Sequence, residues 1–249
     1  MASHPSLAHQ GHRPWPIPSR PWALRQTWHD LLFAHWTVPA DALRPLIPPA
    51  LTLQEFSGTA WLAMTPFWMS GIGFRGLPAM PGVSRFDELN VRTYVTFADR
   101  PGVWFFSLDA GNRLAVRTAR WLYGLPYVSA RMWHHAEGDE LVYHSERADG
   151  TRFDARYGPV GPVVTNRAGS AEYWLTERYC LYAQGSSGRL YRAEIHHEPW
   201  SLQPAQAAIS RNDLPRVHGI ELGGPPALLH FSRRLEVVVW PRQRLSTAG

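Results

Sequence analysis

Turn-forming residues divide almost the whole chain into short β-prone runs, and this pattern restricts the fold more than any other feature. The clearest example is residues 89–98 and 103–109, which are joined by Asp-Arg-Pro-Gly, a sequence that suits a tight turn. Further strands are expected over residues 31–38, 59–69, 127–135, 141–146, 189–197 and 228–240. The sequence therefore predicts a mainly β fold with a few short helices.

Three segments have a helical pattern. They are residues 41–44, which end at a run of prolines, residues 113–123, and residues 170–178, for which Ser170 is a candidate N-cap. The expected apolar side of the second segment consists of Leu114, Ala115, Ala119 and Leu122. These helices are too few and too short to dominate the fold.

The beginning of the chain differs from the rest. Residues 1–21 are rich in proline, which disfavours regular structure, and we expect them to form an arm. No linker interrupts the remainder, so residues 22–249 are expected to form a single β domain. A single cysteine, the absence of an apolar leader and the absence of an apolar run of about 18 residues predict a cytoplasmic chain without a membrane span.

All 25 basic residues are arginines, and the chain contains no lysine. Chemistry that needs a lysine nucleophile is therefore excluded. The net charge of +5 could indicate nucleic-acid binding, but the arginines are scattered and no nucleic-acid-binding motif accompanies them. We expect no nucleic-acid partner.

Residues 71–76, Gly-Ile-Gly-Phe-Arg-Gly, have the spacing of a dinucleotide-binding loop. Such a loop requires a helix directly after it, whereas residues 77–82 contain two prolines and a glycine. The chain also lacks the Gly-x-Ser-x-Gly motif of the serine hydrolases. We expect no bound cofactor.

Two histidine pairs, His134-His135 and His196-His197, could suggest a metal site. Neighbours on a strand point to opposite faces, so neither pair can chelate a metal ion, and we expect none. Cys180 lies between large apolar residues, which favours a buried side chain over a nucleophile.

The strand beginning at residue 86 carries the strongest candidate site. With a period of two, one face presents Glu88, Asn90, Arg92 and Tyr94. This face is either ordinary solvated surface or the wall of a cavity. The partner strand has Trp104, Phe106 and Leu108 on one face and Phe105 on the other, and aromatic residues on both faces favour the cavity.

In such a cavity Glu88 is a candidate acid–base catalyst, and Arg92, with Asn90 and Tyr94, a candidate binding site for a small anion. Burial would raise the pKa of Glu88 by about 3–5 units, whereas contact with Arg92 would lower it by about 1–3 units. The two effects are comparable, so the sequence leaves the protonation state open.

Several motifs resemble known families. ADALRPLIPPAL at residues 40–51 and NDLP at residues 212–215 are similar to segments of the acetoacetate decarboxylase-like superfamily. FDELNVRTYV at residues 86–95, VWFFSLDA at 103–110 and LTERY at 175–179 resemble the YqjF-like bacterial branch of that superfamily more specifically. The resemblance extends from Trp22 to Trp240. It implies an antiparallel, cone-shaped β-barrel and assembly as a homo-oligomer.

In the decarboxylases of this superfamily, a lysine forms a Schiff base with the substrate. The corresponding stretch here is TARWLYGLPY at residues 118–127, in which Arg120 or Trp121 takes the position of the lysine. An arginine guanidinium stays protonated and cannot form the imine. The carboxylate of the decarboxylases corresponds to Glu88, and Arg120 joins Arg92 as a candidate for binding the anion.

Three functions remain open. The chain could be an enzyme acting on an oxo-acid or a similar small anion through Glu88 and an arginine, without a Schiff base. It could be a binding or sensing protein that kept the pocket without the chemistry. It could also be a structural homo-oligomer whose interior is filled by side chains.

Overall fold

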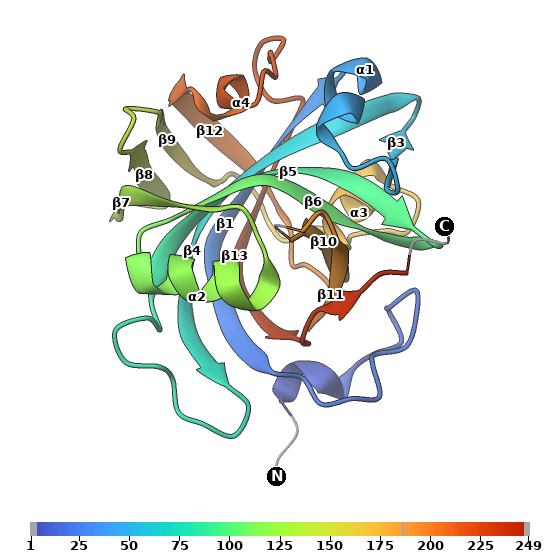
Figure 1. Ribbon diagram of the computed structural model, residues 1–249. Coiled ribbons are helices and arrows are strands. Elements are labelled where there is room, and N and C mark those ends of the chain that lie inside the picture. The colour runs from blue at the N-terminus through green and yellow to red at the C-terminus, as the bar shows by residue number, and fades with distance from the viewer. Residues whose placement is uncertain (1–3, 186, 247–249) are drawn as a thin grey trace.

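The computed structural model describes residues 4–185 and 187–246, and of Trp121 only the backbone. In this part of the chain a 14-stranded sheet dominates (Figure 1), which confirms the prediction of a mainly β protein. The strands are β1 (Leu24–Val38), β2 (Thr52–Leu53), β3 (Glu55–Phe56), β4 (Thr59–Phe74), β5 (Phe86–Phe97), β6 (Arg100–Ala110), β7 (Tyr127–Glu137), β8 (Glu140–Arg147), β9 (Arg152–Pro159), β10 (Cys180–Gln184), β11 (Leu190–His197), β12 (Gln203–Asn212), β13 (Leu228–Val239) and β14 (Gln243–Arg244).

The pairings of the long strands form a closed circuit. The order is β5, β4, β1, β13, β11, β10 and β6, and β6 then pairs with β5. Most pairs are antiparallel, but β6 pairs in parallel with both β7 and β10. The predicted antiparallel arrangement is wrong at these two pairs. The first arises because a helix carries the chain from the end of β6 back to the start of β7, as a parallel connection requires.

The helices are short. They are α1 (Ala40–Leu43), α2 (Arg113–Tyr123), α3 (Ala171–Thr176) and α4 (Leu214–Val217), together with the 3-10 helices η1 (Pro5–Ala8) and η2 (Arg44–Leu46). The second predicted helix is confirmed over its full length. Among the described residues, none of the helices is long and apolar enough to span a membrane.

Helix α2 lies across the strands in the lower half of the molecule as drawn in Figure 1. The side chain of Asn112 begins it by accepting hydrogen bonds from the backbone N–H groups of Leu114 and Ala115 at 3.0 and 3.1 Å, and Gly124 ends it in a left-handed conformation. Leu114 was predicted to face inward but is 62% exposed, because the inward side begins one residue later, at Ala115.

The hairpin of β5 and β6 contains an irregularity that the sequence does not reveal. Val91 pairs with Ser107, but its neighbour Arg92 pairs with Phe105, so Phe106 is an extra residue in β6. A β-bulge of this kind reverses the alternation beyond it. Leu108 therefore shares its face with Phe105, and the prediction that grouped Leu108 with Trp104 and Phe106 is wrong.

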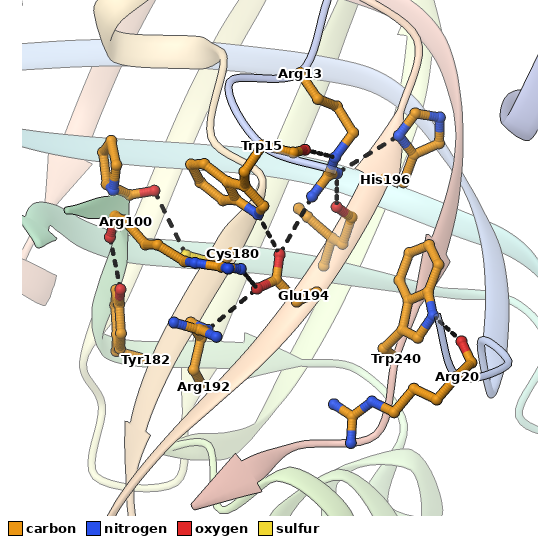
Figure 2. Close-up of polar contacts among 12 residues, drawn as sticks. Arg13, Trp15, Arg20, Arg100, Cys180, Tyr182, Arg192, Glu194, His196 and Trp240 are labelled. Atoms are coloured by element: carbon orange, nitrogen blue, oxygen red, sulfur yellow. Dashed lines mark hydrogen bonds and ion pairs between the residues drawn. The ribbon is translucent and has the colours of Figure 1, made fainter. Parts of the chain in front are cut away.

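The N-terminal arm packs on β11, and it contains one 3-10 turn where no regular structure was expected. Figure 2 shows its main anchor, the carboxylate of Glu194, which is 1% exposed. Arg13 and Trp15 of the arm donate hydrogen bonds to this carboxylate at 3.2 and 2.8 Å. Arg100 and Arg192 contact its other oxygen at 2.9 and 3.1 Å. The buried charge of Glu194 thus joins the arm to two strands.

Candidate active site

A cavity of about 160 Å³ lies inside the circuit of strands. Strands β1, β4, β5 and β6 form much of its wall, and α2 closes one side with Ala115, Thr118, Ala119, Leu122 and Tyr123. Most of the other lining side chains are apolar, among them Leu31, Phe67, Met69, Ile72, Phe86 and Phe105. The cavity is therefore mostly apolar, and its polar groups determine which ligand it can bind and in which orientation.

Strand β5 supplies three of these polar groups. Glu88, Asn90 and Arg92 line the cavity and are only 3%, 6% and 8% exposed. The opposite face of β5 carries Leu89 and Val91, which are fully buried in a separate apolar cluster. Because both faces of the strand are covered, the polar face is the wall of a cavity and not solvated surface.

Tyr94 follows the same alternation but lies behind the cavity wall. Its hydroxyl is 2.8 Å from Nε2 of His35, and its ring packs against Trp174 at 5.0 Å between centroids. It is not among the lining residues. The ring of Tyr94 also lies next to Arg178, with 4.9 Å between the ring centre and the guanidinium carbon. Because Arg178 lines the cavity, Tyr94 supports a residue of the cavity wall from behind.

Arg120 is a second predicted site residue that does not line the cavity. It lies on the exposed side of α2 and donates hydrogen bonds from Nε, at 2.7 Å, and from Nη2 to the backbone carbonyl of Tyr127. Helical periodicity turns it away from Ala115, Ala119 and Leu122, which line the cavity. Its predicted place beside Arg92 is therefore wrong.

Glu88 has the chemistry expected of a proton carrier. Burial raises the pKa of its carboxyl group to about 7, and hydrogen bonds from Tyr127 and Asn90 offset part of that rise. The hydroxyl of Tyr127 donates to Oε2 of Glu88 at 2.8 Å. Burial and the adjacent Glu88 raise the pKa of Tyr127 well above its usual value, so the phenol keeps its proton and acts as the donor.

Arg92 was expected to lower the pKa of Glu88, but it is not among the groups that do so. Hydrogen bonds from Tyr127 and Asn90 are what oppose the rise in pKa caused by burial. Residues four apart on a strand are separated by about 13 Å along the chain. The acid and the arginine therefore stand apart on the same wall, with Asn90 between them.

Arg178 is a site residue that the sequence analysis missed. It lines the cavity at 5% exposure, and its Nε and Nη1 donate to the carbonyl of Trp174 and to Oε1 of Gln54 at 2.8 and 2.7 Å. Burial lowers the pKa of Arg178 to about 10, so it remains charged at neutral pH. Glu177, its neighbour in the chain, accepts hydrogen bonds from Asn166 and from the backbone N–H of Trp200.

Several buried polar atoms of lining residues have no partner within the protein. They are Nε1 of Trp28, Oγ1 of Thr65, Oδ1 of Asn90, Nε of Arg92, Nη2 of Arg178 and Nε1 of Trp200. Buried polar groups are almost always hydrogen-bonded in folded proteins. Because these unpartnered atoms line one cavity, they indicate a ligand site with more hydrogen-bond donors than acceptors.

The two histidine pairs separate as the alternation predicts. His197 lines the cavity and is neutral because burial lowers its pKa to about 4, whereas His196 faces the arm and has Nε2 at 2.6 Å from the carbonyl of Ser6. His134 and His135 contact the carboxylates of Asp87 and Glu137 respectively. Within the described residues no group of three or more histidine, cysteine, aspartate or glutamate side chains could hold a metal ion.

Cys180 is buried, as the sequence predicts, and burial raises the pKa of its thiol to about 12. At neutral pH the thiol is therefore protonated and a poor nucleophile. It packs in the apolar cluster on the far side of the strands from the cavity-lining residues Phe105 and Leu108.

Solved structures with the same fold are distant in sequence. An acetoacetate decarboxylase from Legionella pneumophila subsp. pneumophila strain Philadelphia 1 matches with a TM-score of 0.66 at 11% identity, over 99% of this chain and 98% of that chain. The enduracididine biosynthesis enzyme MppR, complexed with pyruvate, matches with a TM-score of 0.64 at 12% identity, over 95% and 93%. At such identities the likeness shows the fold alone.

Sequence comparison is more specific. The uncharacterized protein YqjF of Bacillus subtilis (strain 168) is 44% identical over 232 residues, which make up 92% of this chain and 96% of YqjF. The model of the family DUF2071, described as an uncharacterized conserved protein (COG2071), matches residues 25–236. The predicted relationship to YqjF is confirmed, and the chain belongs to the DUF2071 family of YqjF-like proteins, which has the acetoacetate decarboxylase-like fold.

Proposed function

We propose that the protein is an enzyme that transfers a proton at the carbon next to the carbonyl of a small oxo-acid, without a Schiff base. The observation that carries this proposal is Glu88, a buried acid with a pKa of about 7 in a mostly apolar cavity that Arg92 also lines. A general base works best when its pKa is close to the ambient pH. The pyruvate complex of MppR, a protein of the same fold, supports an oxo-acid as the ligand.

In the proposed step the carboxylate of the substrate binds Arg92, and the ionised Glu88 accepts a proton from the carbon on the other side of the carbonyl. The electrons of the broken C–H bond move onto the carbonyl oxygen and form an enolate. The hydrogen bond from Tyr127 keeps the carboxylate of Glu88 oriented, and the apolar walls exclude water from the reacting carbon. Return of the proton restores the carbonyl, so the step is reversible.

The test is exchange of the methyl protons of pyruvate for deuterium, followed by NMR. We expect the exchange rate to rise with pH and to level off above about 7, where Glu88 has lost its proton. Glu88→Gln should abolish exchange and retain binding, whereas Arg92→Leu should weaken binding. Arg131→Leu, which removes a 77% exposed arginine, is the control. Full exchange by Glu88→Gln would exclude Glu88 as the base.

A binding or sensing protein is the second candidate, and the absence of lysine favours it, because the fold has lost the nucleophile that the decarboxylases use. In that case a small carboxylate should raise the melting temperature through Arg92, but no exchange should occur. Binding at 100 times the dissociation constant stabilises the folded state by about 2.7 kcal/mol, so the shift is measurable.

The same resemblance leads us to propose that the circuit of strands forms a cone-shaped β-barrel within one domain over residues 22–249, behind the arm of residues 1–21. We further propose that the chain assembles as a homo-oligomer in the cytoplasm. Light scattering coupled to size-exclusion chromatography measures the assembly directly. A mass of 28.2 kDa, that of one chain, would exclude the oligomer.

A further inference from the structure

Two buried arginines of the cavity lack a negatively charged partner. Arg13 and Arg147, which are also buried, pair with Glu194 and Asp109, but no described carboxylate pairs with Arg92 or Arg178. Nε of Arg92 and Nη2 of Arg178 are without a hydrogen-bond acceptor. A buried unpaired charge is costly, so a cavity that contains two of them is suited to an anion.

The guanidinium of Arg92 packs against a ring that Trp200 also contacts. It lies over the ring of Phe33, with 5.3 Å between the guanidinium carbon and the ring centre, and Trp200 packs edge-on against the same ring at 4.7 Å. Trp28 stacks on Trp200 at 5.8 Å, and the indole N–H groups of both tryptophans have no acceptor. A carboxylate can accept about four hydrogen bonds, which matches such a set of donors.

The opposite end of the cavity is different. Phe86 and Arg92 both line it from β5, where they lie six positions, or about 20 Å, apart along the strand. Phe86 pairs with Met69 of β4 and packs in one apolar cluster with Ile72 and Met80. Val83 of the loop after β4 and Ala119 and Leu122 of α2 also line the cavity. Glu88, two positions from Phe86 on the same face of β5, is the ionisable group next to this apolar wall.

The size of the chamber limits what can occupy it. An apolar cavity of about 150 Å³ holds one benzene molecule, so the space of about 160 Å³ can take an apolar group of up to about six carbons. A ligand as short as pyruvate, bound to Arg92, would leave the wall around Phe86 empty. Filling that wall would add favourable apolar contact for each methylene group buried.

We infer that the natural ligand is an amphipathic carboxylic acid, whose carboxylate is held jointly by Arg92 and Arg178 and whose other end is a branched or aromatic apolar group of about four to six carbons. This inference rests on the proposed function for the position of the carboxylate, and it adds the class of the substrate. It also assigns Arg178 to anion binding.

The test is calorimetric titration of the whole chain with three acids that differ only in the substituent. They are pyruvate, 4-methyl-2-oxopentanoate and phenylpyruvate. The two larger acids should bind at least about tenfold more tightly than pyruvate, because each buried methylene group improves affinity about fourfold. The uncharged ketone 4-methylpentan-2-one should bind at least about tenfold more weakly than 4-methyl-2-oxopentanoate, since it lacks the carboxylate.

Two variants test the two ends separately. Ala119→Leu narrows the cavity from α2 and should weaken binding of the larger acids more than binding of pyruvate. Arg117→Leu introduces the same side chain at an exposed position of the same helix and should change nothing. Arg178→Gln should weaken binding of all three acids at least about tenfold, and circular dichroism verifies that it is folded.

Each outcome separates this inference from the proposed function. If pyruvate binds as tightly as the larger acids and Arg92→Leu abolishes binding of both, the apolar group is wrong but the oxo-acid site remains. Unchanged affinity in a folded Arg178→Gln variant would remove Arg178 from the site. If none of the acids binds the parent protein, both the inference and the proposed function are wrong.

Discussion

Glu88 illustrates how one buried residue can link stability to function. Its pKa of about 7 in the folded protein is raised from the usual 4.5, so the folded chain retains a proton that the unfolded chain releases. The folded state is therefore penalised progressively as the pH rises from about 4.5 to 7, and the full penalty applies above 7. A difference of this size corresponds to about 3 kcal/mol.

We therefore predict that Glu88→Gln is more stable than the parent by up to about 3 kcal/mol at pH 8 and equally stable at pH 4. The amide is uncharged at both values and can still accept the hydrogen bond from Tyr127. Urea unfolding across this pH range measures the difference. A constant difference at all pH values would show that the effect comes from packing and not from ionisation.

At the same scale, the residues of the site show what alternation can and cannot predict. A period of two correctly placed Glu88, Asn90 and Arg92 on one wall. The same alternation wrongly placed Tyr94 on this wall, whereas the structure has it behind the wall. It also could not predict Arg178, because Arg178 belongs to the segment after α3 and not to β5. The LTERY motif contained the only signal for Arg178, because periodicity within one strand does not report on distant segments.

Among the elements, those with strong local signals were predictable. The β5–β6 hairpin and α2 were predicted from such signals, but the hairpin turns at Ala98 and Asp99 and not over residues 99–102, since Pro101 and Gly102 pair with β5. The strands β9, β10 and β12 were missed, since β10 is only five residues long and β12 contains a proline among mostly polar residues. The bulge at Phe106 was also missed, because its register depends on the pairing with β5 and not on local sequence.

Helix α2 should depend on Asn112 for its position as a wall of the cavity. Besides capping the helix, this side chain donates from Nδ2 to the carbonyl of Gly82 at 2.6 Å and thereby ties α2 to the loop after β4. We predict that Asn112→Ala costs about 1 kcal/mol in urea unfolding and weakens ligand binding. Asn112→Asp retains the capping oxygen and should lose less stability. Equal losses in both variants would show that the cap contributes nothing.

For the molecule as a whole, the arm and the sheet are held together by one buried cluster of charges. Arg13 is the member of the arm that enters it, with Nη2 at 3.2 Å from Glu194, and both side chains are 1% exposed. The guanidinium carbon of Arg13 also lies 4.8 Å from the ring centre of Tyr179, directly after Arg178 in the chain. The arm thus packs against the segment that delivers an arginine to the cavity.

We predict that Arg13→Ala destabilises the protein by about 3–5 kcal/mol, because removing one partner of a buried ion pair leaves the other charge poorly compensated. Arg100 and Arg192 still contact Glu194, so the loss should fall at the lower end of that range. Arg234→Ala, which removes a 60% exposed partner of Glu236, should cost less than about 1 kcal/mol. Urea unfolding measures both losses, and proteolysis of the folded variants should cut first within residues 4–20. If Arg13→Ala unfolds like the Arg234→Ala control and its arm resists cleavage equally, the arm is held by its apolar contacts and the charges at Glu194 stabilise only the sheet.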